Sequence, residues 1–471
     1  MRLVIKFGGV PVKDGESIRR AAEFVVDRYR KRDKPVVVTS AMAGVTDDLV
    51  AISQALIKPR ANPKQLIPKF MKHISDKHFL ACRAAIVNKD VLYRVTRTVK
   101  DTLDSLDRVL TGVSYLGELS SQSQDLLLSF GERLSAPILA GTTESLGVPS
   151  QYMTGFDAGI VTDNNFTEAR PLFEKTNKLV RQRLGRIFAE GEVPVVTGFI
   201  AGTEDGVMTT LGRGGSDYSA SILGAALGVD EIWIMTDVDG IMTADPKVEP
   251  NARVIKVISY LEATELAYFG AKVLHPKMIR PAMELDIPVR VRNASRPERE
   301  GTLIVRKPRR IEGIVKAITA SKNVSLITVG GAEMIGAPGV TAAVFEILGR
   351  GGINVLMISQ SSSQANISFA VNSKDVDAAL HAIRTEFTQR NIDWSLTCDR
   401  NASVIATVGA GMKGTPGVAA RVFNTIGRNR VNILMIAQGS SELNISFAVN
   451  EADALKAVRA LHREFGLGKA A

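Results

Sequence analysis

The first residues of the chain alternate apolar runs of strand length with a helical pattern. Residues 3–7 and 35–41 are rich in β-branched side chains, and residues 17–32, between them, carry apolar side chains at helical spacing. A strand, a helix and a second strand in this order are typical of a parallel sheet, whose ligands bind at the carboxyl ends of the strands. The pattern therefore predicts an α/β domain at the start of the chain.

Strand patterns disappear between about Asp47 and Leu128, where apolar residues recur at helical spacing, as they do at 90–110. Both patterns alternate again further on, with predicted strands at 193–200, 230–240 and 287–293 and predicted helices at 216–227 and 260–269. We therefore expect one α/β domain over residues 1–302, with a helical insertion at about 47–128. The charged, proline-containing stretch 303–312 is interpreted as a linker.

A near-repeat follows this predicted linker. Residues 336–372 and 414–450 align without a gap and are identical at 23 of 37 positions. Each copy predicts a strand, a helix, two strands and a helix. Two copies are too few for a solenoid, so we expect them to pack as a pair.

The last strand of each copy predicts how the pair is divided. The first copy continues into a strand at 393–399, so it is expected to span 320–399. The second copy lacks such a strand, and we expect residues 313–319 to supply it, which gives a second unit of 313–319 plus 400–471.

Composition excludes several classes of protein. Of 471 residues 45% are hydrophobic, an ordinary value for a globular protein of about three domains. Cys82 and Cys398 stand outside any Cys/His cluster, so neither a disulfide framework nor a structural zinc site is predicted. No apolar run is long enough for a membrane span, and the N-terminus has no signal-peptide pattern. We expect a cytoplasmic protein without a membrane partner.

The net charge of +10 raises the question of a nucleic-acid partner. Lysine and arginine are scattered among 49 acidic residues and form no basic stripe or recognition helix. We therefore expect no nucleic acid, and we interpret the excess charge as suited to anionic substrates.

Four segments of the first domain have the residue types of an anion site. Lys6–Gly9 ends a strand with a lysine and two glycines, which lets backbone N–H groups approach phosphate oxygens. Residues 209–220 place Arg213 between glycines before a helix start. Residues 236–246 form an Asp- and Thr-rich strand end, and 269–276 present Lys272. Each segment alone is also compatible with a turn or a solvated charge, and 236–246 lacks the glutamate of a calcium-binding EF-hand.

Together the motifs resemble aspartate kinase over essentially the whole chain. They are, in order, KFGG, SAMAGVTDDL (40–49), SFGERLSA (129–136), GFIAG with TTLGRGGSD (198–217), TDVDGIMTADP and FGAKVLHP, followed by the repeats. The resemblance implies an α/β amino acid kinase fold, a mainly parallel sheet between helices with a helical insertion, followed by two βαββαβ ACT domains. It implies transfer of phosphate from MgATP to the β-carboxylate of L-aspartate, the first step towards lysine, methionine and threonine.

The resemblance also assigns roles to residues. Lys6 and the amides of Gly8 and Gly9 would contact the transferring phosphates, Asp217 would hold Lys6, and Mg²⁺ would arrive with the nucleotide, without a metal site of the protein's own. The implied aspartate-site residues are Ser40, Thr46, Glu132, Phe199, Arg213 and Ser216. The implied nucleotide-site residues are Thr236, Asp237, Met242, Lys247 and Lys272. For Ser40 and Thr46, helix capping is the alternative.

Three departures from the family pattern affect the nucleotide site. Val10 and Pro11 replace two hydroxyl residues, Met242 stands where a tyrosine is frequent, and Lys247 stands where an arginine is frequent. These changes put nucleotide affinity in doubt, whereas the catalytic lysine and Arg213 are present.

In the repeats, the resemblance implies an amino-acid effector bound by matching residues of the two copies: Gly339, Asn354 and Gln360, with Gly417, Asn432 and Gln438. The segments ISQSSS and IAQGSS resemble those of threonine-sensitive aspartate kinases more than those of lysine-sensitive ones. We therefore expect feedback inhibition, by threonine rather than lysine. We also expect a monofunctional enzyme, and a homodimer or larger homo-oligomer that forms through the ACT domains.

Two alternatives remain open. Another amino acid kinase, acting on glutamate, acetylglutamate, carbamate or UMP, is the nearest, and the Glu132 motif and the paired repeats argue against it. The other is a kinase-derived amino-acid sensor that no longer turns over, which Val10 and Pro11 alone support.

Overall fold

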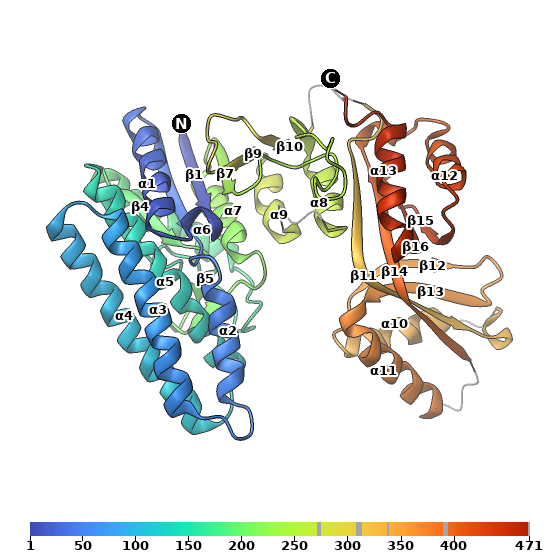
Figure 1. Cartoon of the computed structure of the whole chain (residues 1–471), viewed down its shortest axis with the longest axis horizontal. Coiled ribbons are helices and arrows are strands. Elements are labelled where there is room, and N and C mark those ends of the chain that lie inside the picture. Colours follow the sequence, from blue (N-terminus) through green and yellow to red (C-terminus); the bar gives the residue numbers. More distant parts are fainter. Residues whose placement is uncertain (271–274, 308–312, 337–338, 390–393, 470–471) are drawn as a thin grey trace. The chain divides into compact units, whose positions relative to one another are not determined.

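The computed structural model describes residues 1–270, 275–307, 313–336, 339–389 and 394–469 (Figure 1). Its described residues form two compact units. The first comprises Met1–Ile241, Lys256–Tyr260 and Lys272–Lys307, and the second Met242–Ile255, Leu261–Ala271 and Pro308–Ala471. The predicted first domain was one continuous range, 1–302, whereas each observed unit combines three separate stretches of the chain. The bounds stay a proposal.

The first unit is built on an eight-stranded sheet. Its strands, in spatial order, are β3 (Ser150–Met153), β4 (Val193–Thr197), β2 (Lys34–Thr39), β1 (Arg2–Phe7), β7 (Glu231–Thr236), β9 (Val289–Asn293), β10 (Thr302–Val305) and β8 (Val257–Ser259). All neighbours are parallel except β9 and β10. The predicted parallel sheet is confirmed. Because β4, β2, β1 and β7 run the same way, the loops that follow them meet at one edge.

Helices cover this sheet and form the insertion. They are α1 (Gly15–Arg30), α2 (Val45–Leu56), α3 (Pro63–Ala85), α4 (Lys89–Leu116), α5 (Ser121–Ser145), α6 (Phe173–Ala189), α7 (Gly215–Leu227) and α9 (Pro276–Glu284), with a short 3₁₀ turn η1 (Val10–Val12). On α4, Val91, Val95 and Val99 recur at four-residue spacing and are buried, which produces the apolar stripe that packs α4 into the core. Figure 1 shows α3, α4 and α5 side by side.

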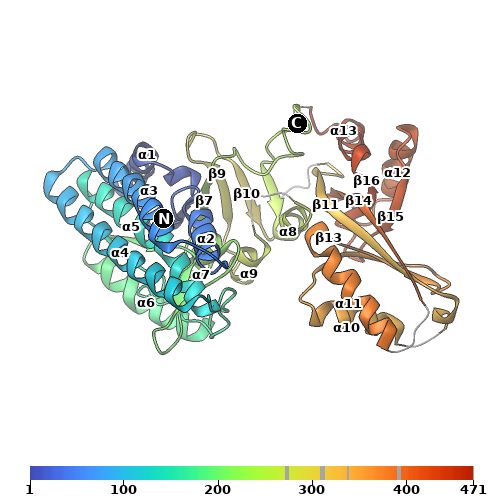
Figure 2. The same ribbon diagram turned by 60° about the horizontal axis from the view of Figure 1, so that its bottom comes forward.

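The second unit contains a six-stranded antiparallel sheet. Its strands, in spatial order, are β12 (Val355–Gln360), β13 (Asn366–Asn372), β11 (Ala317–Gly330), β14 (Ser395–Val408), β16 (Asn444–Asn450) and β15 (Ile433–Ala437). Its helices are α10 (Val340–Arg350) and α11 (Val376–Gln389) in the first copy, α12 (Val418–Arg428) and α13 (Ala454–Glu464) in the second, and α8 (Tyr260–Tyr268) from Leu261 onward. Figure 2 shows α10 beside α11.

The long strand β11 joins the two copies. Residues 324–330 pair with β13 of the first copy, and residues 317–321 pair with 404–408 of β14, the strand beside β16 of the second copy. Residues 317–319, expected as a spare strand for the second copy, therefore lie next to its strands. They continue directly into the first copy as one strand rather than as a separate element.

The predicted linker 303–312 was wrong at its start. Residues 303–305 belong to β10, which pairs with β9 and β8. The interpretation rested on the neighbouring charges and overlooked the sequence TLIV, whose side chains alternate between buried and partly exposed as a strand at a sheet requires. Residues 308–312 lie outside the described residues.

Two stretches from before the predicted linker pack within the second unit. The N–H of Ile318 donates to the carbonyl oxygen of Thr243 (2.9 Å), and the Thr243 hydroxyl contacts Nε2 of His462 (3.0 Å). Glu262 and Lys316 form a buried ion pair with an oxygen–nitrogen distance of 3.2 Å. Polar groups of this kind hold the stretches to the repeats because, once buried, each requires a partner. No described helix is long and apolar enough to cross a membrane.

Candidate active site

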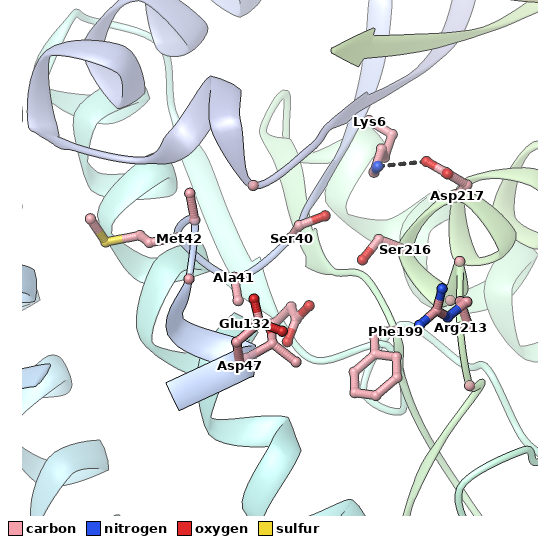
Figure 3. Close-up of a pocket in the computed structure, with 17 residues that line it drawn as sticks. Lys6, Ser40, Ala41, Met42, Asp47, Glu132, Phe199, Arg213, Ser216 and Asp217 are labelled. Carbon is pink, nitrogen blue, oxygen red and sulfur yellow. Dashed lines mark ion pairs between the residues drawn. The ribbon is translucent and has the colours of Figure 1, made fainter. Parts of the chain in front are cut away.

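A cavity of about 360 Å³ opens in the first unit at the carboxyl ends of the parallel strands. Its lining comes from β1 and the loop after it, from the loops after β2 and β4, from α5, from the turn 212–214 and from the N-terminal ends of α2 and α7. The predicted site residues on its wall are Lys6, Gly9, Ser40, Thr46, Glu132, Phe199, Arg213, Ser216 and Asp217. All six residues of the expected aspartate site and the expected catalytic lysine are thus brought to one place (Figure 3).

Lys6 reaches the cavity from β1, at the centre of the sheet. Its ammonium nitrogen lies 2.5 Å from a carboxylate oxygen of Asp217 in the first turn of α7. Both side chains are largely buried, with 11% and 14% exposed. A charge pair in such a position fixes the lysine, because the long side chain would otherwise sample several rotamers.

Ser40 follows β2 and is fixed by its own backbone. Its N–H donates to the carbonyl oxygen of Phe7 (3.0 Å), and its carbonyl oxygen accepts from the Ser135 hydroxyl (2.7 Å). The N-cap of α2 is Gly44, with φ of 83°, so neither Ser40 nor Thr46 is the cap of this helix. The alternative interpretation of these two residues therefore does not hold for α2.

Glu132 projects from α5 and is 4% exposed. Burial raises the pKa of its carboxyl group to about 8, although the backbone N–H of Ala41 and the charge of Lys6 act in the opposite direction. Its second carboxylate oxygen has no partner among the described residues. A buried acceptor without a donor is costly, so this oxygen is suited to a ligand that donates hydrogen bonds.

Arg213 belongs to the GRGG turn before α7 and enters the cavity from the side opposite Glu132 (Figure 3). It forms no ion pair with any described residue, so its guanidinium group is available to a ligand. Gly214 has a φ of 73°, and a Cβ there would lie 2.4 Å from the His275 side chain. Only glycine fits this close turn. Phe199 on the same wall also has a positive φ of 66°, an unfavourable conformation for a bulky residue.

The expected phosphate contacts are only partly available. The N–H of Gly8 donates to the carbonyl oxygen of Met235 (3.1 Å), extending the pairing of β1 with β7. One N–H cannot serve two acceptors well, so of the two expected amide contacts the Gly9 contact is the better supported, and both stay predictions. A Cβ on Gly9 would lie 3.1 Å from the carbonyl oxygen of Ala41. Glycine at this position therefore avoids a close contact between the loops after β1 and β2.

The other expected nucleotide residues lie in different places. Thr236 and Asp237 line a second hollow of the first unit, together with Val10, Pro11 and Lys13. Met242 and Lys247 belong to the second unit, and Lys272 lies outside the described residues. No group of three or more His, Cys, Asp or Glu side chains in the described part of the chain is placed to hold a metal ion.

The expected effector residues occupy matching positions in the two copies. Gly339 and Gly417 are the N-caps of α10 and α12, with φ of 90° and 82°. Asn354 and Asn432 precede β12 and β15 and are exposed. Gln360 ends β12 and Gln438 follows β15, and both are exposed.

Several cavity residues were not singled out from the sequence. Met42, Gly44 and Asp47 lie within the SAMAGVTDD motif, which contained the signal for them. Lys77 of α3 was also missed, although its ammonium group donates to the carbonyl oxygen of Ala43 (2.5 Å) and so supports this loop. No motif surrounds Lys77, and only the packing of the insertion identifies it.

Comparison with known families divides the chain as its two kinds of sheet do. Residues 1–293 match the model of the amino acid kinase family. Residues 327–387 and 405–465 each match an ACT domain model.

Similar proteins cover almost all of the chain. The bifunctional aspartokinase/homoserine dehydrogenase 1 of Arabidopsis thaliana is 35% identical over 99% of this chain, which spans 51% of that protein. Aspartokinase 3 of the same plant is 33% identical over 98% of this chain and 81% of its own length. The chain thus spans about half the length of the bifunctional relatives.

The chain also resembles solved structures. The crystal structure of Escherichia coli aspartokinase III with aspartate and ADP superposes with a TM-score of 0.84 at 29% identity, over 99% of this chain and all of that one. Its lysine and aspartate complex has a TM-score of 0.79 at 29% identity, over 98% of this chain and 99% of that one.

Proposed function

This chain belongs to the aspartokinase branch of the amino acid kinase family, and we propose that it transfers the γ-phosphoryl group of ATP to the β-carboxylate of L-aspartate. A carboxylate oxygen attacks the γ-phosphorus, the bond to the bridging oxygen of ADP breaks, and 4-phospho-L-aspartate and ADP leave. This is the first step of a route to lysine, threonine and methionine.

The reaction requires little acid–base chemistry from the protein. A side-chain carboxylate with a pKa of about 3.9 is ionised at neutral pH, so the nucleophile needs no general base. The remaining task is to hold two anions together and to stabilise the charge of the transferring group. Lys6, fixed by Asp217, and the Gly9 amide supply positive charge and a hydrogen-bond donor. Mg²⁺ bound to the nucleotide would neutralise further phosphate charge.

The observation that carries the proposal is the placement of a carboxyl group and a guanidinium group on opposite sides of one cavity (Figure 3). Glu132 offers an oxygen that has no partner among the described residues, and Arg213 offers a guanidinium group that forms no ion pair with any of them. An α-amino acid presents an ammonium and a carboxylate group that match them, and the guanidinium fork can bind a carboxylate with two hydrogen bonds. Lys6, which lines the same cavity, is then available to the phosphoryl group.

The direct test is an assay in which hydroxylamine traps the acyl phosphate, with ATP and either aspartate or glutamate. Formation of aspartyl hydroxamate, with glutamate at least tenfold poorer, would support the proposal. Preference for glutamate would favour another amino acid kinase. Binding of an amino acid without turnover would favour the alternative of an amino-acid sensor, which Val10 and Pro11 support.

Replacing Arg213 with lysine should raise the aspartate KM by about 10- to 100-fold. Lysine keeps the charge but cannot form the two-pronged contact, and a hydrogen bond to a charged group contributes about 1.5–3 kcal/mol. Steady-state kinetics with varied aspartate measures the change, and Arg19→Lys on the exposed face of α1 is the matched control. An aspartate KM within twofold of the wild-type value in Arg213→Lys would exclude this role.

We further propose feedback inhibition by L-threonine bound at the repeats. The resemblance of the two glutamine-containing segments supports threonine, whereas the lysine complex of the Escherichia coli enzyme keeps lysine as the alternative. The double variant Gln360→Ala, Gln438→Ala should raise the threonine concentration for half-inhibition by about tenfold or more, because each glutamine would contribute about one hydrogen bond of 0.5–1.5 kcal/mol. Inhibition curves for threonine and lysine measure this, with exposed Gln389→Ala as control. An unchanged threonine curve would refute the assignment.

Assembly through the repeats and a cytoplasmic location remain predictions. Strands β12 and β15 are the edges of the second sheet and expose Ile358 (46%) and Ile436 (45%). Unpaired edges with apolar side chains favour pairing with another chain, which supports a homodimer or larger homo-oligomer. Sedimentation of the full chain tests it.

A further inference from the structure

Asp125, in the first turns of α5, is a buried carboxylate that lies outside the cavity lining. Its side chain is fully buried, yet no sequence motif draws attention to it. It accepts hydrogen bonds from the N–H of Thr167 (2.9 Å), the N–H of Thr210 (2.9 Å) and the hydroxyl of Thr210 (2.6 Å). One carboxylate thus fastens a loop and a strand to the helix.

The strand fastened in this way leads directly to the cavity. Thr210 ends β6 (Met208–Thr210), which pairs with β5 (Ile200–Gly202), and Arg213 follows three positions later. Between them, the N–H of Leu211 donates to the carbonyl oxygen of Phe199 (2.9 Å), another cavity residue. Holding Thr210 therefore fixes the start of the turn that carries Arg213.

The fastened loop supports the same turn from the other side. The N–H of Ala169 donates to the carbonyl oxygen of Thr210 (3.0 Å), and a Cβ on Gly212 would lie 3.0 Å from the carbonyl oxygen of Thr167. Thr167 has a φ of 71°, which a β-branched residue adopts only when its surroundings enforce it. The hydrogen bond to Asp125 is one of these constraints.

Asp125 and Glu132 share α5, about two helical turns apart and on the same face. The helix that supplies the cavity carboxylate therefore also sets the position of the cavity guanidinium group. We propose that Asp125 is a positioning residue for aspartate binding, which acts by holding the Arg213 turn at a fixed distance from Glu132. This inference rests on the proposed function.

The test is a double-mutant cycle between Asp125→Asn and Arg213→Ala. Asparagine keeps the shape but removes the negative charge. Its oxygen can accept from the two N–H groups, and its NH₂ group must then donate to the Thr210 hydroxyl, so three charge-assisted hydrogen bonds become weaker neutral ones. Asp125→Asn should raise the aspartate KM about tenfold or more and leave the ATP KM within about twofold, because a small displacement of a positioning group has a large effect on one substrate. In the Arg213→Ala background the same change should have less than about a threefold effect. Equal effects in both backgrounds, or equal changes in both KM values, would overturn the proposal.

Thr210 supplies variants in case Asp125→Asn folds poorly. Thr210→Val removes one of the three donors and should raise the aspartate KM about three- to fivefold, whereas Thr210→Ser keeps the hydroxyl and should restore the wild-type value. Asp163→Asn is the matched control, since Asp163 accepts from the N–H groups of Asn165 and Arg170 in the same loop. Equal KM values for the valine and serine variants would contradict the proposal.

Hydrogen exchange separates this inference from the proposed function. Amides of residues 210–215 should exchange at least about tenfold faster in Asp125→Asn than in the wild type or in Asp163→Asn, whether or not aspartate is the substrate. Unchanged exchange overturns the positioning role by itself. Faster exchange in a protein that does not turn over aspartate refutes the proposed function and leaves the structural part of the inference standing.

Discussion

Replacing Lys6 with methionine is expected to lower kcat by about 10³-fold, because the variant loses the cation placed to meet the charge of the transferring phosphoryl group. Removing one preorganised donor from an active site commonly costs 10²–10³-fold in kcat, and a full charge belongs at the upper end of this range. The ATP- and aspartate-dependent assay at saturating substrates measures the loss.

The ion pair with Asp217 dictates the controls for this variant. Methionine at position 6 leaves a largely buried carboxylate without its partner, which can destabilise the fold. The double variant Lys6→Met, Asp217→Asn removes both charges and should recover stability in thermal unfolding without recovering turnover. Lys34→Met, at the exposed start of β2, controls for the loss of a surface lysine. If Lys6→Met kept kcat within tenfold of the wild type, the proposed role would be wrong.

Replacing Glu132 with glutamine is expected to raise the aspartate KM by about 10²-fold. The isosteric amide keeps the volume of the side chain but loses the charge that would pair with the substrate ammonium group, and breaking a buried charge pair costs about 3 kcal/mol. Because kcat depends mainly on groups near the phosphoryl group, it should change much less. Equal losses in kcat and KM would instead indicate general damage to the cavity.

The pH dependence of the aspartate KM gives a second test of Glu132. Burial raises the pKa of this group to about 8, so in the free protein it is mostly protonated at neutral pH and must lose its proton to bind an ammonium group. Aspartate should therefore bind more tightly as pH rises towards 8, with the KM increasing up to about tenfold for each pH unit below that value. The substrate's own ionisable groups affect the wild type and Glu132→Gln equally, so they cannot cause a difference between the two. The aspartate KM of Glu132→Gln should therefore stay constant between about pH 6 and 8. A wild-type KM that does not change over this range would exclude the proposed proton release.

The same shift affects the stability of the free protein. The folded-state pKa of Glu132 lies above the ordinary glutamate value of 4.5, so the folded form holds a proton that the unfolded form releases between these two values. The free energy of unfolding should consequently decrease as pH rises from about 4.5 to about 8, and Glu132→Gln should remove this contribution.

The positions of the site residues were predictable to different extents. Lys6, Ser40 and Arg213 stand at strand ends or in a glycine turn, where the local pattern and the parallel sheet together specify one edge. Asp125 and Lys77 lie in helices without a motif, and all their partners but the Thr210 hydroxyl are backbone groups distant in the sequence. A hydrogen bond to a backbone group leaves no signature in the partner's residue type, so these contacts were not predictable.

The sequence by itself determined the succession of elements, the parallel sheet and the pairing of the repeats. Hydrophobic spacing is a local property of the sequence, and a duplication is found by aligning the sequence with itself. The tertiary structure alone decided that Met242–Ile255 and Leu261–Ala271 belong with the repeats and that Gly8 gives its N–H to Met235. It also decided that the second oxygen of Glu132 stays without a partner in the described part of the protein. These outcomes depend on which buried polar groups of distant segments form hydrogen bonds with one another. Hydrophobic spacing along the chain does not specify those partners.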